Sequence, residues 1–212
     1  MDELHFSHVP VLLDACLEGL NIRPDGIYVD GTAGGAGHSR AIAERLDGGR
    51  LIALDKDPDA VAVASSRLAP FGCATVVQSE FSELCTVLDK LGIEAVDGIL
   101  LDLGVSSYQL DTPERGFSYA HDAPLDMRMT KTGLSARDVV NTYSFKDLCR
   151  VFRDYGEEKF APAIAKKYFE IQDAAPNCNN SRIGGNYWRV DSRKGTARRG
   201  QPCKARLSSD SH

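Results

Sequence analysis

A loop of small residues early in the chain has the composition of a ligand-binding turn. Residues 30–39 read DGTAGGAGHS, with four glycines and two alanines in ten positions. Glycine has no Cβ, so such a loop lets a ligand come close to the backbone. The loop begins at Asp30, and two later acids, Asp55 and Asp102, also follow apolar runs. One such acid is often only a helix cap or a turn residue, but three beside one glycine loop favour a ligand site.

The elements that must position this site alternate between strands and helices. Apolar runs predict strands within residues 27–30, 48–57, 74–81 and 96–104. Helical spacing of apolar residues predicts helices within 9–20, 39–46, 58–71 and 82–92, with Ser39 near the start of the second and Pro58 in the first turn of the third. This alternation predicts an α/β fold with a doubly wound parallel sheet. In such sheets ligands bind beyond the carboxyl ends of the strands, which is where the three acids fall.

Two cofactor classes remain open from the loop and the acids alone. A dinucleotide site needs the spacing Gly-x-Gly-x-x-Gly. Gly35 and Gly37 begin that spacing, but its last position is Arg40. S-adenosylmethionine carries no phosphate and needs an acid after the second strand for its ribose hydroxyls, and Asp55 fits that role. A nicotinamide dehydrogenase and an S-adenosylmethionine protein are therefore both compatible with these residues.

Composition bounds the class of protein without giving a function. The chain has 212 residues, 42% of them hydrophobic, and a net charge of −5. Residues 171–212 carry eight Lys/Arg against three Asp/Glu, whereas the first 170 residues carry 17 against 27. No run is long and apolar enough for a transmembrane helix, and the N-terminus lacks the features of a signal peptide. The six cysteines have no metal-ligand spacing, so we expect free thiols, no metal and a cytoplasmic location.

A series of motifs points to one family. They are HVPVLLD, YVDGTAGGAGHS, ALDKDP, DLGVSSYQLD, ERGFSY, DAPLDMRM and YGEEKFA, spread over roughly residues 5–169. Together they resemble the bacterial MraW family of S-adenosylmethionine-dependent methyltransferases, which methylate N4 of a cytidine in small-subunit (16S) ribosomal RNA. The resemblance implies a Rossmann-like class I methyltransferase fold, with only the first four strands of its sheet and the start of a helical insertion encoded here. It also implies the small ribosomal subunit as a partner.

The resemblance also implies the residues of the cofactor site. Residues 36–38 would lie against the methionine end of S-adenosylmethionine, Asp55 would accept from the ribose hydroxyls, and Phe81 would lie near the adenine. Asp102 is also the candidate catalytic residue, because its carboxylate, or a hydroxyl of Ser106 or Ser107, could contact the target amine. The full set of implied cofactor contacts is Ala36, Gly37, His38, Asp55, Phe81, Asp102 and Gln109.

Three regions follow from this comparison. Residues 1–117 would form the cofactor-binding half, 118–170 the start of an RNA-recognition insertion, and 171–212 a tail. Within the insertion we expect two helices over residues 135–161, beginning near Ser135 and Ser144. Four arginines are candidates for phosphate contacts, although solvated surface is the default for each: Arg115, Arg128, Arg150 and Arg153.

The tail differs from the rest of the chain. Residues 173–212 have no apolar period and many helix breakers, which taken at face value is typical of disorder. A back-translation of residues 177–194 shifted by one base reads as an amphipathic helix similar to the family, so we predict a frameshift near residue 170. A sheet of only four strands would leave an unpaired edge, and we expect weak cofactor binding and little or no methyl transfer from this chain. The alternative function is a non-enzymatic nucleotide- or RNA-binding module with a basic tail.

Overall fold

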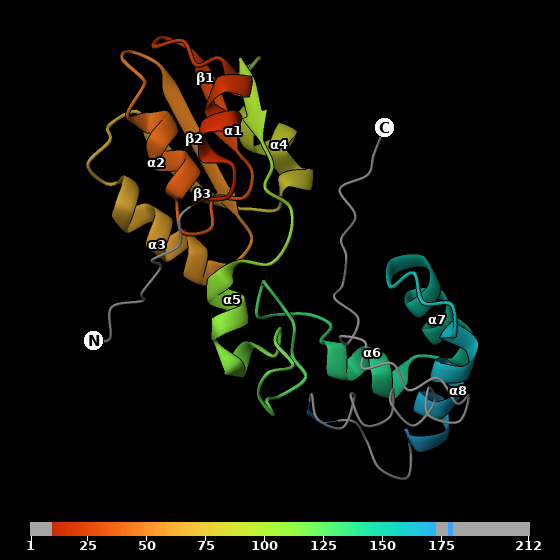
Figure 1. Cartoon of the computed structure of the whole chain (residues 1–212). Coiled ribbons are helices and arrows are strands. Elements are labelled where there is room, and N and C mark those ends of the chain that lie inside the picture. Colours follow the sequence, from red (N-terminus) through yellow and green to blue (C-terminus); the bar gives the residue numbers. More distant parts are fainter. Residues whose placement is uncertain (1–9, 173–177, 180–212) are drawn as a thin grey trace. The chain divides into compact units, whose positions relative to one another are not determined.

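The computed structural model describes residues 10–172 and 178–179, which belong to two compact units (Figure 1). The first unit contains the chain up to Leu103 together with Met129–Lys131. The second contains Gly104–Arg128 and the chain from Thr132 onward. The functional boundary expected at residue 117 stays a prediction. Most of the tail lies outside the described residues, and the frameshift expected near residue 170 stays a prediction.

Within residues 10–103, the first unit has a parallel sheet of four strands in the order β3-β2-β1-β4. Its strands are β1 (Ile27–Asp30), β2 (Arg50–Asp55), β3 (Ala74–Gln78) and β4 (Gly98–Leu100). Its helices are α1 (Leu13–Leu20), α2 (Gly37–Ala43), α3 (Pro58–Leu68) and α4 (Leu84–Lys90), with a 3₁₀ turn at Phe81–Glu83. The predicted α/β fold with a parallel sheet is confirmed.

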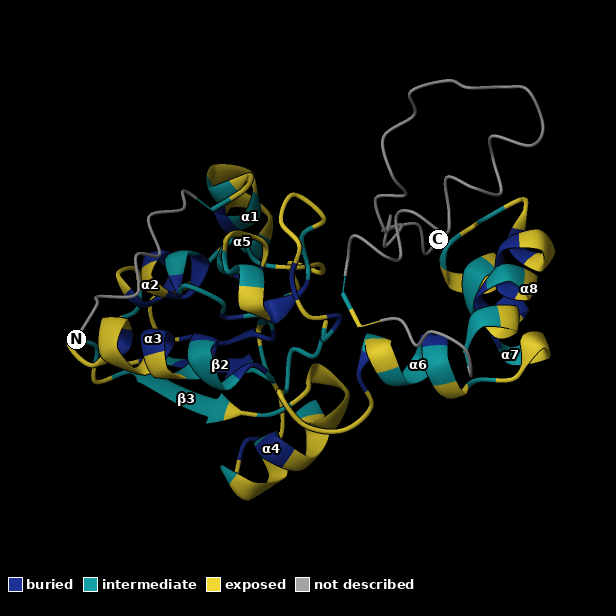
Figure 2. Ribbon diagram, turned by 90° about the horizontal axis from the view of Figure 1, so that it is seen from below, coloured by how far each residue is buried: buried dark blue, intermediate teal, exposed yellow. Residues whose placement is uncertain are grey.

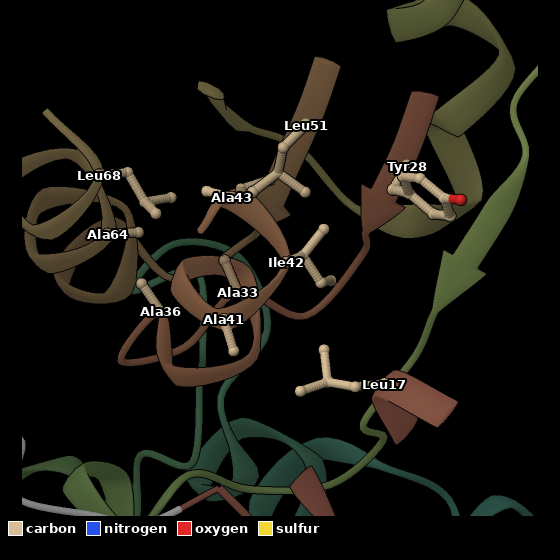
Figure 3. Packing of buried hydrophobic residues seen from close by; sticks show 11 residues of the cluster. Leu17, Tyr28, Ala33, Ala36, Ala41, Ile42, Ala43, Leu51, Ala64 and Leu68 are labelled. Atoms are coloured by element: carbon tan, nitrogen blue, oxygen red, sulfur yellow. The ribbon is translucent and has the colours of Figure 1, made fainter. Parts of the chain in front are cut away.

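The helices cover the two faces of the sheet in different ways. On one face α1, α2 and α3 pack through many small side chains, including Ala41, Ala43 and Ala64 (Figure 3). On the other face α4 packs on a cluster of larger aliphatic residues that includes Val29 and Ile52. Helices α2 and α3 precede strands added to one side of β1, and α4 precedes β4 on the other side. Right-handed crossovers place helices on opposite faces when the strand order reverses in this way.

Local signals set where the elements begin and end. Helix α3 starts at Pro58, and Asp57 caps it by accepting a hydrogen bond from the backbone N–H of Asp59 at 3.0 Å. Helix α2 starts at Gly37, two residues before Ser39. Strand β4 ends at Leu100, so Asp102 lies two residues beyond the strand.

The second unit is helical. Figure 2 shows its helices, coloured by how far each residue is buried. Its helices are α5 (Ser107–Asp111), α6 (Ala136–Thr142), α7 (Phe145–Arg150) and α8 (Ala161–Ile171), with a 3₁₀ turn at Pro113–Arg115 and a π-helical turn at Val151–Tyr155. The predicted starts at Ser135 and Ser144 are confirmed, because both hydroxyls accept a backbone N–H three residues later. Leu148 and Ala165 are fully buried at its centre. No helix among the described residues has the length and apolar character needed to span a membrane.

Two isoleucines of the sheet provide a test of the packing. Ile52 is 0% exposed between β1, β3 and α4, whereas Ile99 on β4 is 47% exposed. We expect Ile52→Ala to lower the free energy of unfolding by about 2–5 kcal/mol, because it removes buried contacts and leaves a cavity. The matched variant Ile99→Ala should cost less than about 1 kcal/mol. Urea unfolding followed by circular dichroism measures both, and equal losses would contradict the burial described here.

Candidate functional site

The site is centred on the loop that follows β1. Asp30, the last residue of β1, is 1% exposed. Its Oδ1 accepts a hydrogen bond from the backbone N–H of Thr32 at 3.1 Å, and its Oδ2 accepts one from the hydroxyl of Ser39 at 2.5 Å. Ser39 is therefore tied to the strand end, and it does not cap α2. Asp30 holds together the two ends of the glycine loop.

Burial changes the proton affinity of this carboxyl. Desolvation raises the pKa of Asp30 above its ordinary value, and the hydrogen bonds from Ser39 and Thr32 lower it in part. A neutral carboxyl is thus favoured at this position relative to the unfolded chain. The nearby Asp55 raises the pKa of Asp30 slightly further.

The loop itself has a strained and well-anchored backbone. Gly34 has a φ of 49° and Ala36 a φ of 61°, in the left-handed region that an alanine adopts only at a cost. The backbone N–H of Ala33 donates to the carbonyl of Leu54 at 2.8 Å. From outside, Nη1 of Arg67 on α3 donates to the carbonyl of Gly35 at 2.6 Å. These contacts hold the loop against β2 and α3.

Asp55 connects the loop to the end of β2. Its Oδ2 accepts from the backbone N–H of Gly34, and its Oδ1 accepts from that of Asp57, both at 2.8 Å. Desolvation raises the pKa of Asp55, and the backbone hydrogen bonds of Asp57 and Gly34 oppose that shift. Each carboxylate oxygen has a second lone pair, so both can still accept from a ligand hydroxyl.

Part of the loop is covered by the chain itself. A Cβ on Gly37 would overlap the ring of Pro10, and Nε2 of His38 lies 3.2 Å from the carbonyl of Val11. A carbonyl only accepts, so this hydrogen bond requires the proton on Nε2. Ala36 is buried, and so is His38. The segment before α1 thus contacts two of the three residues expected at the methionine end of a cofactor.

Two further predicted residues lie beside the same loop. Phe81 follows β3 and is 44% exposed, and a Cβ built on Gly31 would be 3.3 Å from its Cβ. Asp102 is exposed, and its backbone N–H donates to Oγ1 of Thr32 at 2.7 Å. Leu101 packs on Gly31 so closely that a Cβ there would lie 2.5 Å from its Cδ2. The first unit therefore gathers Asp55, Phe81 and Asp102 around residues 31–37.

Sequence reasoning missed two residues that anchor this site. Thr32 is a small polar residue inside a loop of glycines and alanines, and its hydroxyl joins the loop to the chain after β4. That composition was a usable signal, since a single hydroxyl among small apolar residues invites a local hydrogen bond. Arg67 had no such signal, because it comes 32 residues after its partner Gly35 and reads as an ordinary helix surface residue.

Gln109 belongs to the second unit, in the first turn of α5. It is buried, and its Oε1 accepts from the backbone N–H of Ser106 at 3.0 Å. The hydroxyl of Ser106 accepts in return from the backbone N–H of Gln109 at 3.2 Å, which completes a capping box at the start of α5. The contact of Gln109 with a cofactor stays a prediction.

The four arginines considered for phosphate contacts differ in exposure. Arg115 is buried, with Nη2 donating to the carbonyl of Arg128 at 3.0 Å. Arg128 forms a bidentate hydrogen bond with Asp126, and this lowers the pKa of that carboxyl. Arg150 and Arg153 are exposed, and Arg150 lies 3.8 Å from Asp147. Only these last two present an exposed guanidinium, whereas Arg115 acts within the fold.

No group of three or more His, Cys, Asp or Glu side chains suitable for a metal occurs within the part of the chain that the structure describes. The groups that could contact a bound molecule at this site are the carboxylates at the strand ends and the backbone groups of the loop. A parallel α/β sheet with a glycine loop after its first strand and an acid after its second defines the class of Rossmann-like folds.

Comparison with known proteins identifies the family within that class. The profile of the MraW methylase family matches residues 5–204, so the chain belongs to this family. The match runs past residue 169, where we expected the resemblance to end. A solved structure from Clostridium thermocellum, described as a candidate rRNA methylase, has a TM-score of 0.38 at 18% identity and covers 52% of this chain and 62% of that one. At that score it adds nothing to the assignment.

Curated relatives agree with the family match. Ribosomal RNA small subunit methyltransferase H 2 of Agathobacter rectalis is 63% identical over 167 residues, which are 77% of this chain and 53% of the relative. Ribosomal RNA small subunit methyltransferase H of Lachnospira eligens is 57% identical, with 82% and 56% covered. The protein of the same name from Carboxydothermus hydrogenoformans is 51% identical, with 82% and 56% covered. The chain spans about half the length of the curated relatives it matches.

The buried carboxyl of Asp30 gives a test that depends on pH. Its raised pKa means that the folded state binds the proton more tightly than the unfolded chain. Its contribution to stability is therefore complete below the ordinary carboxyl pKa and is lost as pH rises through the raised value. Asp30→Asn mimics the neutral form, so its free energy of unfolding relative to the wild type should increase from about pH 4 to about pH 7. Urea unfolding across this range measures the difference, and a difference independent of pH would contradict the assignment.

Proposed function

We propose that the first unit binds S-adenosylmethionine and that the protein is a methyltransferase for N4 of a cytidine in small-subunit (16S) ribosomal RNA, acting in the cytoplasm. The observation that carries this proposal is the pair formed by Gly34 and Asp55. Their hydrogen bond sets an acid with free acceptor capacity beside a loop that a small ligand can approach. Membership of the MraW methylase family supports the same assignment.

The residues present fit the chemistry of this cofactor. Asp55 can accept from two ribose hydroxyls, and the exposed ring of Phe81 is an apolar surface for an adenine. The Gly-x-Gly-x-x-Gly spacing of a dinucleotide site is incomplete in this loop, because its last position is Arg40. This departure favours a cofactor without phosphates over a dinucleotide. The contacts of residues 36–38 with the methionine end remain part of the proposal.

When bound, S-adenosylmethionine supplies a methyl group that is already activated by its positive sulfur. The protein must then orient the cytosine amine, whose lone pair is delocalised into the ring, and accept the proton that it loses. Asp102 is exposed and lies two residues after β4, at the same carboxyl end of the sheet as the loop. We assign it the contact with the amine. The target base must leave any stack to reach such a site.

The RNA substrate is proposed from the relatives, which are named as methyltransferases of the small-subunit ribosomal RNA. Arg150 and Arg153 are the two exposed arginines among the four that we considered for the RNA. The alternative is a module that binds RNA without catalysis. Retention of RNA that depends on residues 171–212 and not on Asp55 would favour that alternative.

Cofactor binding is the first test. We expect Asp55→Asn to weaken S-adenosylmethionine binding by about 10- to 100-fold, because it removes charge-assisted acceptors for the ribose. Asp47→Asn is the matched control, since Asp47 is an exposed acid before the start of β2. Isothermal titration calorimetry measures the affinity of both variants for S-adenosylmethionine. The same titration with NAD tests whether the protein is instead a nicotinamide dehydrogenase. Equal affinities of the two variants, or binding of NAD alone, would contradict the proposal.

The role of Asp102 needs a separate measurement. We expect the wild-type chain to transfer methyl groups to small ribosomal subunits only slowly, because its sheet has an unpaired edge. Asp102→Asn should remove this residual turnover while leaving cofactor affinity unchanged, because the proton acceptor is lost. Methyl transfer is followed with radiolabelled cofactor, and mass spectrometry of the nucleosides identifies N4-methylcytidine. A variant with near-normal turnover and intact cofactor affinity would remove Asp102 from this role.

A further inference from the structure

The candidate catalytic residue lies on a segment that few contacts hold in place. Residues 101–105 follow β4 and are all exposed. In the described part of the chain, the only hydrogen bond of this segment runs from the backbone N–H of Asp102 to Oγ1 of Thr32, at 2.7 Å. The carboxylate of Asp102 has no hydrogen-bond or ion-pair partner among the residues that the structure describes. Its position therefore depends strongly on Thr32.

This hydrogen bond takes the place of a backbone hydrogen bond of the sheet. Strands β1 and β4 pair in parallel as far as Asp30 and Leu100, and the N–H of Gly31 donates to the carbonyl of Leu100 at 2.9 Å. In a regular parallel ladder the next donor on this side, the N–H of Asp102, would meet the carbonyl of Gly31. It meets the hydroxyl of Thr32 instead. The side chain of Thr32 thus extends the pairing by one step and sets where the chain leaves the sheet.

The backbone of Thr32 is itself fixed by buried groups. Its N–H donates to Oδ1 of Asp30 at 3.1 Å, and Asp30 is 1% exposed at the end of β1. The N–H of the next residue, Ala33, donates at 2.8 Å to the carbonyl of Leu54, which is buried on β2. Thr32 is therefore joined to both central strands, and its β-branched side chain has few rotamers. Its hydroxyl is a fixed reference point for Asp102.

The same loop also orients the acid proposed for the ribose. Gly34, two residues after Thr32, donates its N–H to Oδ2 of Asp55 at 2.8 Å. One short stretch of backbone thus sets the place of Asp55 on one side and of Asp102 on the other. Methyl transfer needs the amine and the methyl group in line, and a displacement of about 1 Å can lower a rate by about 100-fold.

We propose that Thr32 is a positioning residue, whose hydroxyl holds Asp102 at a fixed place relative to the glycine loop during methyl transfer. The inference rests on the proposed function, because it takes Asp102 as the residue that meets the target amine. Thr32 acts through the backbone of Asp102 and does not touch the reacting atoms. Loss of its hydroxyl should therefore leave the hydrogen bond between Gly34 and Asp55, and with it cofactor binding, in place.

Two substitutions separate the hydroxyl from the rest of the side chain. Thr32→Val keeps the shape and removes the acceptor, whereas Thr32→Ser keeps the hydroxyl. Solvent exchange of the Asp102 amide, followed by NMR on the full chain without ligand, measures the hold on this residue. We expect exchange at least about tenfold faster in Thr32→Val than in the wild type, and within about threefold of the wild type in Thr32→Ser. Equal exchange in Thr32→Val and the wild type would overturn the proposal.

Residual methyl transfer to small ribosomal subunits tests the consequence for the reaction. At saturating S-adenosylmethionine, we expect Thr32→Val to lower the rate by at least about tenfold while its cofactor Kd stays within about twofold of the wild type, and Thr32→Ser to restore the rate. Thr86→Val is the matched control, since Thr86 is exposed on α4, and it should change neither quantity. An unchanged rate in Thr32→Val, or a loss of cofactor affinity as large as the loss of rate, would overturn the positioning role.

The proposed function and this inference can fail separately. A wild-type chain that binds no S-adenosylmethionine would overturn the proposed function and the catalytic part of the inference. Faster exchange of the Asp102 amide in Thr32→Val would still establish Thr32 as the residue that positions Asp102. Conversely, methyl transfer by a Thr32→Val protein at the wild-type rate would leave the proposed function intact and remove Thr32 from it.

Discussion

The hydrogen bond from the backbone N–H of Gly34 to Oδ2 of Asp55 joins the first two strands of the sheet at the point where a ligand would bind. It fixes the loop after β1 relative to the end of β2, and it orients the carboxylate of Asp55. The buried pair of Asp30 and Ser39 closes the same loop at its base. Together with the hydrogen bonds of Ala33 and Arg67, these two contacts hold the left-handed backbone at Ala36, a conformation that alanine does not favour.

The strands, their helices and the acids at their ends could be predicted from the sequence because each is encoded locally. Buried parallel strands are short apolar runs, and Asp55 ends one of them. The contacts of Pro10 with Gly37 and of Arg67 with Gly35 could not be predicted in this way. They join segments far apart in the sequence, and neither arginine nor proline has a local pattern that marks such a contact. The glycines therefore suggested only a ligand, whereas one of them makes room for another part of the chain.

Strand β4 has no second partner strand among the described residues, and the candidate catalytic residue belongs to the same short segment. Leu101 packs on Gly31, and the N–H of Asp102 reaches the hydroxyl of Thr32. The segment is thus joined to the glycine loop through Leu101 and Asp102, while the side chains of Ile99 and Leu103 are exposed. Few buried contacts and open backbone hydrogen bonds are typical of regions with low local stability. The carboxylate proposed to meet the substrate thus depends on the least supported strand of the sheet.

The alanines that line the core beside the loop restrict how this region can change over evolutionary time. Ala33, Ala36, Ala41 and Ala64 are all buried, and the view in Figure 3 shows them between larger aliphatic side chains. A methyl group leaves almost no volume to lose, and any larger side chain would have to push helix and sheet apart. Substitutions at these alanine positions are therefore limited by the size of the new side chain and not by its hydrophobicity. The face under α4 is built from valine, leucine and isoleucine, which can exchange with one another at much lower cost.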